Sequence, residues 1–157
     1  MRMASIADTG AMRLWNLTYN DPRRWADVHA ISGKPLGFWA SLKAGGTGSP
    51  RAELVGGSGE LPELIGAESA KTVCNFERTA EGAILYFRSR LEVYGAPFCK
   101  GEISGITRLP KGADEQINIW CGWIDPDGQA HSGSIELQCS KAHAVRMEAW
   151  IRLWLMA

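Results

Sequence analysis

Apolar and polar residues alternate through the second half of the chain, and a period of two indicates β-strands with one buried face. Turn-forming residues interrupt this alternation, most clearly at Asp125-Pro126-Asp127-Gly128. Consecutive strands with such short connections pair antiparallel, because parallel pairing needs longer crossovers. We therefore expect an antiparallel meander over residues 71–139. Its strands are expected at 71–78, 83–94, 98–109, around 117–123 and at 135–139, with 83–94 as one long strand and 95–97 as a turn.

After the last expected strand the period becomes that of a helix, and we predict a C-terminal helix over residues 141–156. Apolar residues at helical spacing form the side expected to face the sheet: Met147, Trp150, Ile151 and Trp154. Trp150, on the core side of this helix, is expected to close the core between the helix and the sheet. Trp154 begins a final turn that is apolar all round, so this end is expected to be deeply buried or to contact another chain.

The first seventy residues are less regular. Residues 12–43 are expected to form a strand at 12–19, a helix at 22–31 and a strand at 38–42. Asn20-Asp21-Pro22 marks the helix start, because a capping side chain precedes a proline whose missing N–H is not needed there. Residues 44–70 hold two glycine clusters and are expected to be a mobile stretch with one short strand near 51–55.

These elements fit one domain over residues 1–157, because a chain of this length and 45% hydrophobic content buries its own core. The expected fold class is α+β, mainly antiparallel β. So much apolar material on consecutive strands favours a small barrel or strongly curled sheet, with a short N-terminal helix and a C-terminal helix packed against it.

The composition argues against several classes of protein. Seventeen basic residues balance seventeen acidic ones, whereas a nucleic-acid-binding protein usually carries a basic excess. No apolar run approaches the length of a membrane span. The first residues lack the apolar core of a signal peptide, and the four cysteines lie far apart, so we expect a cytoplasmic protein with reduced thiols.

No stretch carries a specific catalytic or metal-binding motif. The glycine clusters lack the Gly-Lys-Ser/Thr ending of a phosphate-binding loop, and the turn at 125–128 places its glycine too early for a calcium loop. The histidines lack the paired spacing of a zinc site. Cys139 and His143 are close in sequence, but Cys139 is expected to face the core. We therefore expect no cofactor and no metal, and lean toward a protein that is not an enzyme.

Two arginines are the candidate anion-binding residues. Arg88 and Arg90 are expected on one face of the long strand, together with Tyr86 and Tyr94. Guanidinium groups bind carboxylate or phosphate with two parallel hydrogen bonds, so this stripe suits an anionic group. A solvated face of cross-strand ion pairs explains the same pattern.

Two tryptophans are the other candidate binding residues. Trp120 is expected on the strand face opposite Trp123, and therefore exposed, either lining a pocket or forming a partner surface. Trp154, at the tip of the final helix, is the candidate contact for a protein partner or for self-association.

Two families have similar segments. Ile135-Glu136-Leu137-Gln138-Cys139-Ser140 followed by Trp150-Ile151 resembles the end of a PH-like (pleckstrin-homology-like) domain, where the last strand leads through a serine into a helix whose tryptophan faces the barrel. Residues 90–95 and 101–106 are similar to strands of bacterial members. Gly37-Phe38-Trp39 resembles the Gly-x-Trp opening of the calycins. Both resemblances imply a small antiparallel barrel with a helix, and binding rather than catalysis.

Three functions are therefore open. The preferred one is a non-enzymatic binding or adaptor module that engages a protein partner or an anionic group through the face of Arg88 and Arg90 or through the apolar final helix. The second is a calycin-like carrier of a small apolar ligand, with Trp39 and Trp120 near its cavity and residues 44–60 as a lid. The third is a barrel enzyme of isomerase or hydrolase type, which needs a histidine or a buried glutamate facing the cavity.

Overall fold

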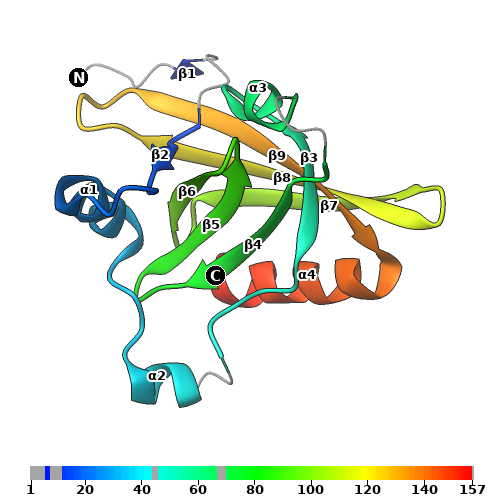
Figure 1. Cartoon of the computed structure of the whole chain (residues 1–157), viewed down its shortest axis with the longest axis horizontal. Helices are drawn as coiled ribbons and strands as arrows, with labels where there is room; N and C mark the ends of the chain where they lie inside the picture. The colour runs from blue at the N-terminus through cyan, green and yellow to red at the C-terminus, as the bar shows by residue number, and fades with distance from the viewer. Residues whose placement is uncertain (1–5, 8–11, 44–45, 67–69, 157) are drawn as a thin grey trace.

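The computed structural model describes residues 6–7, 12–43, 46–66 and 70–156 of the chain (Figure 1). In chain order its elements are β1 (Ile6–Ala7), β2 (Trp15–Asn16), α1 (Pro22–Ser32), α2 (Phe38–Lys43), β3 (Ala52–Gly57), α3 (Leu61–Gly66), β4 (Val73–Arg78), β5 (Gly82–Ser89), β6 (Glu92–Cys99), β7 (Ile103–Lys111), β8 (Asp114–Ile124), β9 (Ala130–Ser140) and α4 (Lys141–Trp154). The predicted α+β class, with a mainly antiparallel sheet and a C-terminal helix, is confirmed. None of the described helices is long and apolar enough to cross a membrane.

Eight strands form one antiparallel sheet in the order β2-β6-β5-β4-β3-β9-β8-β7, and β1 adds to β9 in parallel. β4 to β6 and β7 to β9 are two meanders, and β3 joins them by pairing with β4 on one side and β9 on the other. In the part of the chain that the structure describes, the end strands β2 and β7 do not pair with each other. The sheet is therefore open, and its strand pairing does not form the closed barrel that was one of the two expected forms.

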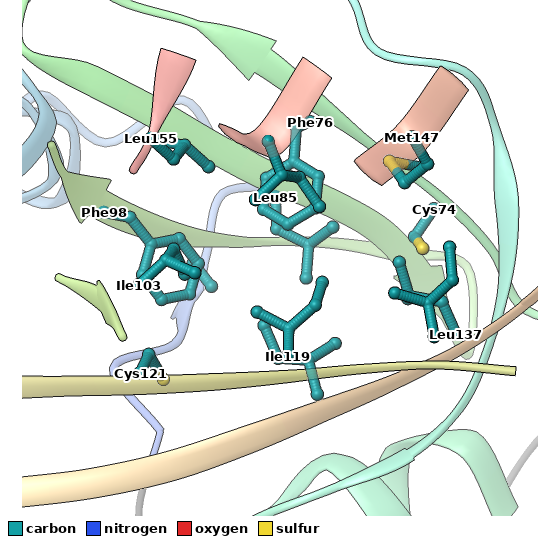
Figure 2. Close-up of a cluster of buried hydrophobic side chains, with 14 of the residues drawn as sticks. Cys74, Phe76, Leu85, Phe98, Ile103, Ile119, Cys121, Leu137, Met147 and Leu155 are labelled. Atoms are coloured by element: carbon teal, nitrogen blue, oxygen red, sulfur yellow. The ribbon is translucent and has the colours of Figure 1, made fainter. Parts of the chain in front are cut away.

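The main core lies between the sheet and α4, and both meanders contribute side chains to it (Figure 2). α4 and its C-cap residue bury four side chains completely: Ala144, Met147, Ile151 and Leu155. Trp150 stacks on Phe76 of β4, with ring centres 5.9 Å apart. The predicted C-terminal helix, with Trp150 toward the sheet, is therefore confirmed.

A smaller apolar cluster lies on the opposite, outer face of β5 and holds α1 against the sheet. Ile84 of β5 is fully buried there against Leu17 and Val28. α1 begins at the predicted cap, where the Asp21 carboxylate accepts a hydrogen bond from the backbone N–H of Arg23 at 2.9 Å. The helix covers part of a sheet face that antiparallel sheets often leave to water.

The prediction of one long strand at 83–94 is wrong, because a tight hairpin divides these residues into β5 and β6. Ser89 pairs with Glu92, and Arg90 and Leu91 between them have φ angles of 52° and 66°. A two-residue hairpin turn with both central residues at positive φ matches the twist of its strands, and it usually carries Asn or Gly. Arg-Leu gives no such signal, so the alternation continues through the turn unmarked.

The expected turn at 95–97 is also wrong, because these residues lie inside β6. Gly95 is a packing position: a Cβ there would lie 2.6 Å from Cδ1 of Leu17, which directly follows β2, the strand paired with β6. The next turn falls instead within the expected strand 98–109, at Gly101, whose φ is 95°. Glycine thus has two different roles a few residues apart, and the sequence alone does not separate them.

The expected strand at 38–42 is wrong, because these residues form the helix α2. Within the glycine-rich stretch 44–70, β3 confirms the predicted short strand, and α3 is a helix that the sequence pattern does not predict. β3 lies at the centre of the sheet, where a Cβ on Gly57 would lie 2.7 Å from the backbone oxygen of Ser134. Residues 44–45 and 67–69 of the stretch expected to be mobile lie outside the described residues.

Candidate binding groove

An open groove of about 570 Å³ lies on the outer face of the sheet, beside α1. Trp25 of α1 forms one of its walls. The other lining residues come from β4, β5, β6 and the residue before β3: Arg51, Val73, Asn75, Glu77, Tyr86, Phe87, Arg88 and Val93. This hollow brings together two residues of the predicted binding face, Tyr86 and Arg88, and a helix that packs on the sheet.

Strand alternation and register determine which side chains reach the groove. Phe87 belongs to the main core, so its neighbours Tyr86 and Arg88 point to the outer face. Tyr86 pairs with Asn75 of β4, and Arg88 pairs with Val93 of β6. The floor of the groove is therefore built on paired strands, which hold side chains more rigidly than loops do.

The groove carries more positive than negative charge. No ion pair or hydrogen bond joins the side chain of Arg51 or Arg88 to another described residue, and both side chains are exposed. Glu77 contributes the carboxylate in the lining, and one of its oxygens accepts a hydrogen bond from the Thr47 hydroxyl at 3.3 Å. Two guanidinium groups thus share the groove with one carboxylate.

Tyr86 supplies a neutral hydrogen-bond donor at the centre of this surface. Burial, and to a smaller extent the nearby carboxylate of Glu77, raise the pKa of its phenol to about 12. The phenol therefore keeps its proton throughout the neutral range. Its O–H is available to an acceptor that enters the groove, since no other described group is bonded to it.

A smaller hollow of about 200 Å³ continues from the groove toward the end of β4. Trp25, Glu77 and Tyr86 line both hollows, so they form the shared wall. Leu36 and Ile84 add apolar surface to the smaller hollow, and Ser41 of α2 also lines it. A ligand with a charged end and an apolar end fits this arrangement, with the charged end at Arg51 and Arg88.

The structure separates the residues of the predicted arginine stripe. Arg88 lies in the groove, whereas Arg90 lies in the hairpin turn at the end of β5. Tyr86 packs with the outer cluster, and Tyr94 packs with the main core, where its ring stacks on Phe87 at 5.5 Å. The two tyrosines therefore lie on opposite faces of the sheet. The hairpin turn places Tyr94 on β6 opposite Phe87, whose side chain faces the main core, and paired residues share a face.

Trp120 lies on β8 and is 43% exposed, as its predicted position opposite Trp123 implies. Its backbone oxygen accepts a hydrogen bond from the Ser104 hydroxyl at 3.2 Å, and its ring lies beside Gly105. It is not among the residues that line the groove, so the structure does not bring it together with Arg88.

Trp154 is half-buried, and a cation covers its ring. The guanidinium carbon of Arg78 lies 3.6 Å from the ring centre, a close cation–π contact. Leu155 after it is fully buried, and its backbone oxygen accepts a hydrogen bond from the N–H of Gly101 at 2.8 Å. Trp154 and Leu155 therefore contact their own chain, whereas Leu153 in the same turn is 61% exposed, so the last turn is only partly buried.

Several lining residues of the groove were not identified as binding residues from the sequence, among them Trp25, Arg51 and Asn75. Asn75 could have been identified from the sequence, because it alternates with the buried residues Cys74 and Phe76 on a predicted strand. Trp25 and Arg51 gave no such signal. They come from segments that meet β4 and β5 only through the tertiary fold.

His143 is hydrogen-bonded at a helix cap, and two of the cysteines are buried. His143 Nδ1 lies 2.8 Å from the hydroxyl of Ser140, the N-cap of α4, so it is engaged away from Cys139. Burial raises the pKa of the Cys74 thiol to about 12 and that of the Cys121 thiol to about 11, which disfavours their thiolates. Among the described residues, no group of three or more His, Cys, Asp or Glu side chains is arranged to hold a metal ion.

A stack of side chains links the segment before β2 to the far meander. His131 stacks on Trp123 at 5.7 Å, and the guanidinium of Arg13 lies 4.5 Å from the centre of the Trp123 ring. Arg13 in turn forms an ion pair with Glu102 at 2.6 Å, and His131 is bonded to Asp125 at 2.7 Å. The stack ties the turn at 125–128 to the rest of the fold.

The lowered pKa of Asp125 is expected to make the stability of the protein depend on pH in the acid range. The hydrogen bond from His131, followed by that from the backbone N–H of Gln129, holds the pKa of Asp125 below its usual value. A carboxyl whose pKa is lowered by folding adds stability above its unfolded pKa of about 4, and this stability is lost as the pH falls through the folded pKa. Asp125→Asn should therefore lower stability near neutral pH and reduce the further loss in acid.

Urea unfolding of the wild type and the variant at a series of pH values measures this effect. Asp127→Asn is the matched control, because Asp127 lies in the same turn and its exposed side chain forms no hydrogen bond or ion pair with a described residue. Parallel stability profiles for the wild type and Asp125→Asn would show that this carboxylate plays no such part.

Comparison of the chain with protein-family models, with curated proteins and with solved structures finds no match.

Proposed function

We propose that the protein is a non-enzymatic binding module whose groove beside α1 holds an anionic group. The observation that carries this proposal is the presence of two exposed guanidinium groups, those of Arg51 and Arg88, that form no ion pair with a described residue of their own chain. The ligand class is a carboxylate or a phosphate attached to an apolar or aromatic body, either as a small molecule or as a side chain of a protein partner.

The surroundings of the two arginines support this ligand class. Guanidinium groups form charge-assisted, bidentate hydrogen bonds with planar carboxylates and with phosphates. Trp25 offers an aromatic surface to the ligand body, and the protonated phenol of Tyr86 offers a hydrogen bond. The carboxylate of Glu77, held by Thr47, repels a second anionic charge at the far end and so favours a ligand with one charged end.

The groove is a better-supported contact surface than the tip of α4. Trp154 and Leu155 already contact Arg78 and Gly101 of their own chain, so little of their apolar surface remains for another molecule. Arg88, by contrast, is exposed and borders the hollow. Binding at the groove needs no rearrangement of the core.

A PH-like architecture is part of the same proposal. Both meanders contribute side chains to one core, and α4 follows β9 directly with Ser140 as its cap. Trp150 of α4 faces the sheet and stacks on Phe76, as the resemblance implies. Large side chains such as Phe76 and Phe98 are fully buried between the meanders, and this favours the binding module over a carrier with an internal ligand cavity.

Titration with phenyl phosphate, followed by the backbone and indole signals in ¹H–¹⁵N NMR spectra, tests the proposal. We expect saturable shifts of the Trp25 indole and of amides near Arg51 and Arg88, and none with the neutral probe benzyl alcohol. Arg88→Gln and Arg51→Gln should each weaken phenyl phosphate binding roughly tenfold, because a hydrogen bond to a charged group contributes about 1.5 kcal/mol.

Arg146→Gln is the matched control, because Arg146 is an exposed arginine on α4 and does not line the groove. It should bind phenyl phosphate as the wild type does. Equal weakening by all three substitutions would point to general charge attraction and would contradict the proposal, as would the absence of any saturable shift at Trp25.

A further inference from the structure

α2 exposes three large apolar side chains on a helix of six residues that buries none. Phe38 is 72% exposed, Trp39 is 73% exposed and Leu42 is 62% exposed. The rings of Phe38 and Trp39 meet edge to face, with centres 5.2 Å apart, so they form one apolar knob. Figure 1 shows that this helix projects away from the sheet, with no other element beyond it.

Two hydrogen-bonded stems hold the projecting segment in place. On the entering side, the backbone oxygen of Lys34 accepts a hydrogen bond from the N–H of Ala80 at 2.9 Å. On the leaving side, the backbone oxygen of Thr47 accepts one from the N–H of Arg78 at 2.7 Å, and Gly48 forms a bridge with Glu77. The chain therefore anchors the knob to the end of β4 and still leaves its apolar tip in water.

The charges around the knob have one sign. Lys34 and Lys43 flank α2 and are both exposed, and the sequence from 34 to 52 contains no Asp or Glu. The nearest carboxylates that the stems contact, Glu77 and Glu81, lie at the base of the projection, as Lys34 does, whereas Lys43 lies on α2 itself. An apolar tip with a basic collar complements a surface that is apolar inside and anionic outside.

We propose that α2 is a docking element for an anionic lipid bilayer. Phe38, Trp39 and Leu42 enter the boundary between headgroups and acyl chains, where tryptophan is enriched in membrane proteins. Lys34 and Lys43 contact the anionic headgroups. This surface differs from the phenyl phosphate site at Arg51 and Arg88, so the two proposals stand or fall separately.

The length of α2 favours a bilayer over a groove on a protein. A helix that docks into a protein groove presents anchors over two or more turns, at i, i+3 or i+4, and i+7. α2 has six residues and offers one turn of anchors. A bilayer interface accepts a short apolar insertion and adds affinity for each nearby cation.

Co-sedimentation of the full chain with vesicles tests the proposal. We expect binding to vesicles of phosphatidylcholine and phosphatidylglycerol in a three-to-one mixture, much weaker binding to phosphatidylcholine alone, and loss of binding as salt screens the lysines. Phe38→Ser and Trp39→Ser should each lower the partition coefficient about tenfold. Lys34→Gln combined with Lys43→Gln should lower it about 30-fold, since each cation near the surface contributes roughly 1 kcal/mol.

Ile124→Ser is the matched control, because Ile124 is 68% exposed but precedes the acidic turn with Asp125 and Asp127. It should bind the mixed vesicles as the wild type does. Failure of the wild type to sediment with the mixed vesicles would overturn the proposal and would favour a protein partner for the knob. Equal losses for Ile124→Ser and Phe38→Ser would also overturn it.

Brominated lipids distinguish insertion from adsorption. Bromines on the upper acyl chain quench a tryptophan that enters the interface, so the wild type should lose part of its fluorescence on binding. Trp39→Phe keeps an apolar ring and should still sediment with the mixed vesicles, but without this quenching. Unchanged quenching in Trp39→Phe would assign the membrane contact to a tryptophan elsewhere and would contradict the role of α2.

Discussion

Replacement of Phe76 by alanine is expected to lower the free energy of unfolding by about 3–5 kcal/mol, the range observed when a buried aromatic ring is removed. Phe76 is fully buried on β4, and its ring contacts the rings of Trp150 at 5.9 Å and Phe98 at 6.2 Å. Figure 2 shows it beneath α4 and next to Leu85. The substitution leaves a cavity between the helix and the sheet, where the surrounding rings are too stiff to fill it.

Urea unfolding followed by tryptophan fluorescence and by far-UV circular dichroism measures this loss. Val73→Ala is the matched control, since Val73 lies on the same strand but is 52% exposed. We expect its effect to stay within roughly 0.5 kcal/mol. A similar small effect for Phe76→Ala would mean that α4 does not pack on β4 as described.

Gly82→Ala is expected to destabilise the protein by about 3 kcal/mol or more, because it inserts a methyl group where backbone already lies. A Cβ on Gly82 would lie 1.8 Å from the backbone oxygen of Phe98 and 3.0 Å from Cα of Cys99, its partner in the ladder between β5 and β6. Backbone atoms of a paired strand cannot move aside as the end of a flexible side chain can. Alanine therefore separates the two strands at this end.

Thermal unfolding of the purified variant tests this prediction, with soluble yield as a second readout if the variant does not fold. Gly37→Ala is the control, because a Cβ on Gly37 meets nothing within 4 Å and its φ is not in the left-handed region. It should unfold at nearly the temperature of the wild type. If Gly82→Ala did the same, the close contact between Gly82 and Phe98 would be disproved.

The sequence predicted most of the sheet because a period of two survives wherever one strand face is buried. β4, β8, β9 and α4 follow this rule closely, and α1 was predicted from its cap at Asp21. The hairpin at Arg90 and Leu91 was not predicted, because its residues lack the usual turn preference and the alternation continues across it. β3 was predicted as a strand, but its central place depends on pairs with β4 and β9 that local sequence does not encode.

The candidate site was predictable only in part, for the same reason. Arg88 and Tyr86 follow from alternation along β5, but the residues that reach the groove from other parts of the chain do not. Trp25 and Arg51 reach it from α1 and from the start of β3, through contacts between segments distant in sequence. α2 was mistaken for a strand because Phe38, Trp39 and Leu42 suit a buried strand, and only the fold shows that they are exposed.

The position of β3 also affects how fast the chain reaches its native state. The strands of each meander follow one another along the chain, so each forms through short loop closures. β3 pairs through Glu53 with Val73 nearby and with Gln138 near the start of α4, which brings together the beginning and the end of the sheet. Closure of so long a loop is entropically unfavourable and slows folding. We therefore expect β3 to join the two meanders late, as the step that limits the folding rate.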